Sequence, residues 1–281
     1  MKQLFICLLV IFSLGFLPGQ VLAQELDVPT SSTESGTQET ITTRETLDDE
    51  IVSLRAVYRT QLEEYRTAER QTQIANGQYA QLGTLTALET AVTSTRKTML
   101  LRATVLESYL TLLRLQLTDA TGINLPDKDR VMTRLDAVLS EIATHRQQAE
   151  SATDRTDITN LTTDFDALSS QIESAAYEAQ SMLAIGKLQT VYDKTLALSL
   201  EVRDAAGETT ELKKAERERA YNEIQNTLAA VKANIDNTTP EPERSGSQFS
   251  RSALSNVLRD LGSVYIGLSQ SLSFLSELLR L

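Results

Sequence analysis

Residues 158–182, ITNLTTDFDALSSQIESAAYEAQSM, carry the most regular apolar pattern in the chain. Successive apolar residues are separated by alternating steps of three and four, which places them on one face of an α-helix. The pattern continues to about Asp204, where Ala205-Ala206-Gly207 is expected to end the helix. A helix of that length is about 70 Å long, several times the usual length of about 11–12 residues. Its predicted core face is formed by Ile158, Leu161, Phe165, Leu168, Ile172, Ala175, Ala179 and Met182.

Similar helical spacing recurs on both sides of this segment. Between Pro29 and Pro240 the only proline is Pro126, so little interrupts long helices. The sequence therefore predicts an all-α fold, an elongated antiparallel bundle of long, coiled-coil-like helices over residues 44–236. The expected helices are 44–75, 78–121, 127–150, 156–204, 209–236 and 250–281.

The connections between these helices carry turn and capping signals. Asn76-Gly77 favours a turn between the first two helices, and Gly122 is placed to end the second in a left-handed conformation. Asp127 or Asp129 is expected to cap the third helix.

The N-terminus has the parts of a secretory signal peptide. Lys2 precedes an apolar stretch over residues 4–17, and a breaker and small residues lead up to Ala23. We expect residues 1–23 to be removed and the protein to be secreted or extracytoplasmic. An uncleaved anchor is the alternative, but the apolar stretch is shorter than the ~20 residues of a spanning helix. The only cysteine, Cys7, lies within this segment, so the mature chain would contain no thiol.

Two further segments resemble connections rather than helices. Residues 24–43 are rich in Ser, Thr, Glu and Gln and are expected to form a disordered tether. A loop packed on the bundle is the alternative, with few apolar anchors to hold it. Residues 237–249 contain two prolines and a glycine and are expected to form a linker.

The last segment, residues 250–281, has a strict heptad of large apolar residues with small residues beside it, and no charge lies between Asp260 and Glu277. We interpret this heptad as an interaction seam, which packs within the same chain or mediates self-association or capture of a partner helix. A membrane span is disfavoured because frequent Ser residues and Gln270 interrupt the apolar character, so we expect no transmembrane span in the mature chain. Peripheral membrane contact by this helix is a minor alternative. The candidate seam consists of Leu254, Leu258, Leu261, Tyr265, Leu268, Leu272, Leu275 and Leu279.

Charge and residue inventory narrow the possible chemistry. The formal net charge of −11 argues against nucleic acid and anionic membranes as partners, since both require a basic surface. His145 is the only histidine and lies on an apolar helical stripe, so we expect a partly buried, structural residue bonded to a neighbour rather than a catalytic base. Without a second imidazole or a mature thiol, we predict no His/Cys metal site, no cofactor and no catalytic centre.

These observations favour an exported, non-catalytic helical scaffold or protein–protein interaction protein. The alternative is an extracytoplasmic chaperone-like or sensor-type module that holds clients or ligands between its helices. Asn160 and Asn237 begin glycosylation sequons, which have meaning only in a eukaryotic secretory pathway.

Overall fold

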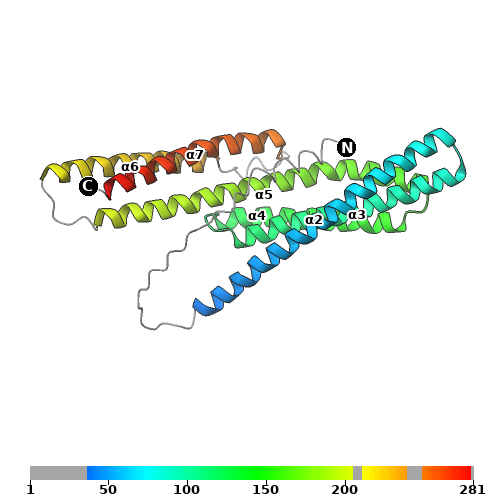
Figure 1. The fold of residues 1–281 in the computed structure, drawn as a ribbon, viewed down its shortest axis with the longest axis horizontal. Helices are drawn as coiled ribbons and strands as arrows, with labels where there is room; N and C mark the ends of the chain where they lie inside the picture. Colours follow the sequence, from blue (N-terminus) through cyan, green and yellow to red (C-terminus); the bar gives the residue numbers. More distant parts are fainter. Residues whose placement is uncertain (1–36, 205–210, 239–248, 280–281) are drawn as a thin grey trace. The chain divides into compact units, whose positions relative to one another are not determined.

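The computed structural model describes residues 37–204, 211–238 and 249–279. Over these ranges the protein is all-α, as predicted, with six helices and no strand (Figure 1). The predicted signal peptide, most of the predicted tether and most of the predicted linker lie outside the described residues. Residues 42–281 form one compact unit, and the packing described below belongs to that unit. The helices are α2 (Thr37–Leu82), α3 (Leu85–Asp119), α4 (Leu125–Ser151), α5 (Arg155–Asp204), α6 (Glu211–Thr238) and α7 (Arg251–Leu278).

The predicted break between the first two helices is in the wrong place. Helix α2 begins at Thr37, continues through Asn76-Gly77 and ends at Leu82. Ala75 is buried, so the packed face of α2 extends up to the dipeptide that was expected to end it. The turn is formed instead by Gly83, whose φ of 61° is favourable only for glycine, and the N–H of Gly83 donates to the Tyr79 carbonyl at 2.9 Å.

The predicted cap of α4 is also corrected. Asn124 occupies the N-cap, and its side-chain oxygen accepts a hydrogen bond from the Asp127 N–H at 2.9 Å. Asp127 therefore lies in the first turn, where a carboxylate is favourable near the positive end of the helix dipole. Pro126 fits the same turn because the first backbone N–H groups of a helix have no intrahelical acceptor. The missing N–H of proline therefore costs no helical hydrogen bond there.

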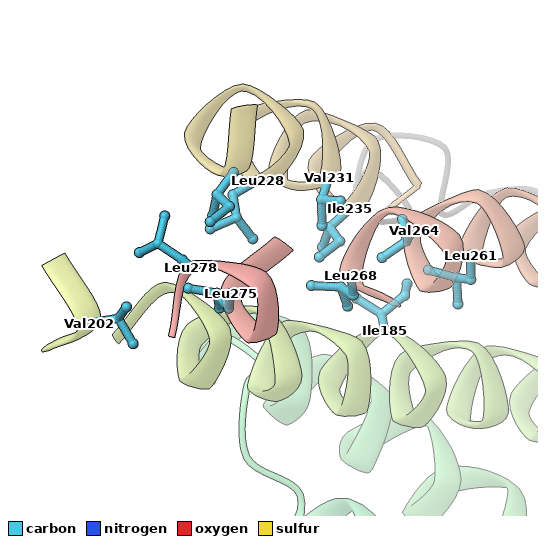
Figure 2. Packing of buried hydrophobic residues seen from close by; sticks show 11 residues of the cluster. Ile185, Val202, Leu228, Val231, Ile235, Leu261, Val264, Leu268, Leu275 and Leu278 are labelled. Atoms are coloured by element: carbon cyan, nitrogen blue, oxygen red, sulfur yellow. The ribbon is translucent and has the colours of Figure 1, made fainter. Parts of the chain in front are cut away.

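Helix α5 is shared by two hydrophobic clusters. Its first half packs with α3 and α4, around Met99, Ala149 and Leu161. Its second half packs with α6 and α7, which lie side by side along it (Figures 1 and 2). All eight residues of the core face predicted for residues 158–182 are buried, so that prediction is confirmed.

The loop between α3 and α4 packs directly on the backbone of α5. A Cβ atom added to Gly186 would lie 2.5 Å from Ile123 Cγ1 and 2.9 Å from the Thr121 carbonyl oxygen. On the loop side, Gly122 has a φ of 75°, and the hydroxyls of Thr121 and Thr190 are 3.0 Å apart. Two glycines therefore permit this approach, one through its lack of a side chain and one through its backbone conformation.

We predict that Gly186→Ala lowers the free energy of unfolding by about 1–3 kcal/mol, because the new methyl group overpacks the contact with the loop. Gly77→Ala is the matched control, since nothing lies within 4 Å of a Cβ at that helical position. It should raise stability by roughly 0.5–1 kcal/mol through helix propensity alone. Urea unfolding followed by helical circular dichroism measures both values. Stabilisation by both substitutions would contradict the described packing of the loop.

Candidate functional site

The structure divides the predicted seam of α7 into two faces. Leu254, Leu261, Leu268 and Leu275 are at most 4% exposed. The last three of them belong to the cluster with α5 and α6 (Figure 2). The other four seam residues face solvent, at 46% exposure for Leu258, 66% for Tyr265, 43% for Leu272 and 67% for Leu279. The seam is therefore half core and half surface.

The orientation of α7 explains this division. Val264, Ser271 and Leu278 complete the buried face in place of the four exposed residues, again with spacings of three and four. Relative to the predicted seam, the inward face is turned by about 50°, half of the rotation per residue in an α-helix. Gly267 favours this rotation, because a Cβ there would lie 2.5 Å from Val231 Cγ2 of α6. The heptad alone could not identify which of two overlapping apolar faces packs inward.

We call the exposed half of the seam, Leu258, Tyr265, Leu272 and Leu279, the outer stripe. Ile266 lies beside it with 58% exposure. Small exposed residues alternate with its large ones, and no residue from 261 to 276 is charged. Contiguous apolar surface of this kind is typical of contact sites. The alternating small residues are Ser255, Gly262, Ser269 and Ser276.

A buried ionic cluster lies where α4 meets the middle of α5. The Glu178 carboxylate, with a side chain only 4% exposed, accepts hydrogen bonds from the guanidinium groups of Arg130 and Arg134. Arg134 also donates to Ser174 Oγ at 2.8 Å, and that oxygen accepts the backbone N–H of Phe249 at 2.6 Å. Arg130 makes a further contact with Asp127 at 3.3 Å, so two cations face two anions. The cluster ties α4, α5 and the entry to α7 together.

Sequence reasoning missed this cluster because Glu178 lies on no predicted apolar face. The available signal was the run of small residues around it in α5, which permits close approach of other helices. That signal identifies no partner.

His145 is buried, as expected from its position on the apolar stripe of α4. Its Nε2–H donates to the Leu161 carbonyl at 3.0 Å, and its ring meets Phe165 edge-on at 5.4 Å between centroids. The Arg102 guanidinium carbon lies 3.3 Å from the centre of the same Phe165 ring. Burial lowers the pKa of Arg102 to about 10, so the guanidinium stays protonated at neutral pH. The only histidine of the chain, His145, is thus packed against Phe165 and donates its hydrogen bond to the Leu161 carbonyl.

Tyrosines in the same half of the unit are also held in buried settings. Burial raises the pKa of Tyr65 to about 12, with a further contribution from Glu69, which accepts a hydrogen bond from its hydroxyl at 3.2 Å. Burial likewise raises the pKa of Tyr109, whose hydroxyl accepts from the Gln180 amide. Both phenols remain neutral at physiological pH.

A hollow of about 340 Å³ lies between the α3–α4 loop, α5 and α6. Its walls include the apolar side chains of Met182, Ile185 and Ile235. On its polar side, Lys232 Nζ lies 2.6 Å from Asp236 Oδ1 and 3.3 Å from Gln189 Oε1. The polar groups of the rim are thus engaged with one another, and polar and apolar groups both line the hollow.

No helix of the described ranges is both long and apolar enough to cross a membrane. Within the same ranges, no group of three or more His, Cys, Asp or Glu residues is arranged to hold a metal ion.

Comparison with known proteins yields no match. This holds for protein-family models, curated proteins and solved structures alike. Functional inference therefore depends on the surface and the buried groups of the chain itself.

The division of the α7 seam predicts opposite outcomes for two similar substitutions. Leu268→Ala should lower the free energy of unfolding by about 2–5 kcal/mol, because it opens a cavity between α5, α6 and α7. Leu272→Ala, one turn away on the outer stripe, should change it by less than about 1 kcal/mol. Urea unfolding of the two variants measures the difference. Equal losses would mean that the orientation of α7 differs from the one described.

The ionic cluster predicts that Glu178→Gln lowers the free energy of unfolding by about 2–3 kcal/mol. This is less than the roughly 3–5 kcal/mol for fully buried pairs, because the arginine side chains are 26% and 30% exposed. Asp136→Asn is the charge-matched control, since Asp136 pairs with Arg114 at the surface and should cost at most about 1 kcal/mol. Thermal and urea unfolding would measure both, and an unchanged Glu178→Gln protein would exclude a structural role for the cluster.

Proposed function

We propose that this chain is an exported, non-catalytic helical scaffold that contacts another protein through the outer stripe of α7. The observation that carries the proposal is the exposure of four large apolar residues in a regular heptad, on a helix whose opposite face is already packed. Burial of these exposed apolar side chains favours association, with a gain of about 25 cal/mol for each Å² of apolar surface removed from water. Export is supported by the signal-peptide pattern of residues 1–23.

A non-catalytic role is supported by the way the buried titratable groups are used. Glu178 is paired with two arginines, and His145 donates to a backbone carbonyl. A general base must reach a substrate proton, directly or through one water molecule. These two groups are instead committed to contacts between helices.

The hollow beside the α3–α4 loop supports a second candidate, an extracytoplasmic binding module for a small ligand. Its lining combines apolar side chains with polar groups, and its volume lies at the lower end of the range for small-molecule sites. The outer stripe is the stronger observation, because the polar groups of the hollow already satisfy one another.

Affinity purification from the extracytoplasmic fraction of the source organism tests the proposal. The baits are the wild-type protein and a Tyr265→Lys/Leu272→Lys variant, which places two cations on the outer stripe. Ser263→Lys/Gln270→Lys is the control, because it adds the same charge to exposed positions of α7 outside the stripe. We expect a stoichiometric protein partner with the wild type and the control and its loss with the stripe variant, at unchanged thermal stability.

Capture of the same proteins by all three baits would overturn the role of the stripe. A small molecule that co-purifies with all three, without any protein partner, would favour the second candidate. Native mass spectrometry of the purified baits detects such a ligand.

A further inference from the structure

The outer stripe has a pattern that is complementary to itself. Its large residues recur every seven positions, and the small residues Ser255, Gly262, Ser269 and Ser276 recur every seven positions between them. Each large side chain is therefore followed along the exposed face by a place where another helix can come close. A surface that alternates in this way fits a helix with the same alternation, displaced by half a repeat.

We propose that the occupant of the outer stripe is the outer stripe of a second copy of this chain, with the two α7 helices antiparallel. This inference rests on the proposed function of the stripe as a contact surface. A two-fold axis on the exposed side of α7, at the level of Gly267 along the helix, places every large residue opposite a small one. The facing pairs are Leu258 with Ser276, Tyr265 with Ser269, Leu272 with Gly262, and Leu279 with Ser255 of the second copy.

Charge favours the same arrangement. No residue from 261 to 276 is charged, so the centre of the contact contains no like-charge repulsion and no buried ion. At the ends of this stretch, the exposed Arg259 comes within one turn of Glu277 of the second copy. In a parallel, in-register pair Tyr265 would face Tyr265, and Gly262 would face Gly262. That pairing alternates crowded and unfilled layers, whereas the antiparallel one has neither.

Other occupants fit this surface less well. Helices that lie on a membrane are rich in Lys and Arg, whereas the centre of this face is uncharged and the chain has a net charge of −11. A two-fold contact also uses the same patch on both copies, so the association ends at a closed dimer. From Ser255 to Leu279 the contact is about 36 Å long. A single pair of helices of this length lies toward the small end of specific interfaces, so we expect reversible association.

The first experiment is light scattering with size-exclusion chromatography over a dilution series of the purified protein. The wild-type mass should rise with concentration from that of the monomer, 31.1 kDa for the full chain, toward twice that value. Tyr265→Lys/Leu272→Lys should remain monomeric at every concentration, and Ser263→Lys/Gln270→Lys should behave as wild type. Equal thermal unfolding of the three proteins shows that the substitutions act on association rather than folding.

Disulfide trapping determines the orientation of the two helices. In a Cys7→Ser background, Arg259→Cys and Ser273→Cys are prepared separately, one with an affinity tag. In the antiparallel pair, position 259 of one copy lies near position 273 of the other. Oxidation should therefore cross-link the mixture of the two variants but neither variant alone. A mixture that fails to cross-link, at concentrations where the wild type is dimeric, would overturn the proposed geometry.

The outcomes separate this inference from the proposed function. A wild-type protein that stays monomeric, yet binds a different protein through the stripe, overturns the inference and leaves the proposed function intact. Monomeric behaviour without any stripe-dependent partner overturns both. Flotation of the wild type, but not of the stripe variant, with zwitterionic or anionic lipid vesicles would replace the second copy with a membrane surface.

Discussion

The middle of α5 is buried on every side, and the arrangement of the other helices follows from that constraint. Six consecutive residues, 174–179, are each at most 5% exposed. A helix buried all round must meet neighbours on several faces, and three of these residues are alanines that permit close approach. The charged member of the run, Glu178, is tolerated because two arginines of α4 supply donors to both of its oxygens. The burial of Glu178 in α5 therefore depends on the two arginines that α4 supplies.

The same helix connects two hydrophobic clusters that have no other described helix in common. The loop between α3 and α4 reaches the backbone of α5 at Gly186, near the start of the part of α5 that belongs to the second cluster. Ile185, next to that glycine, belongs to the cluster with α6 and α7. Because α5 is continuous across this point, displacement of either half would strain a backbone with no break to absorb it.

Much of the fold could be predicted from the sequence, because the spacing of apolar residues reports directly on helix faces. Helix α5 and its core face follow from that spacing, and so does the burial of His145. The turn at Gly83 did not follow, because Asn76-Gly77 is an equally good turn signal, and the buried Ala75 beside it became visible only in the packing. For the α7 seam, the predicted burial holds for only half of the residues. The reason is that Leu258 and Val257 belong to two overlapping apolar faces, and the heptad does not show which of them packs inward. Choosing between those faces needs the shape of α6, in particular Val231 opposite Gly267. The Glu178 cluster also depends on a contact between distant segments, which periodicity does not report.

The position of α7 in the chain has a consequence for the order in which the protein can fold. During synthesis the N-terminal part of a chain becomes available first. Helices α3, α4 and the first half of α5 can bury Met99 and Leu161 with one another before the rest has emerged. In contrast, Leu228 and Ile224 of α6 belong to a cluster that α7 completes, so this cluster stays open until α7 has been made. A chain that is truncated between α6 and α7 should therefore keep a folded first half while its α6 remains exposed to proteases and to other unfolded chains.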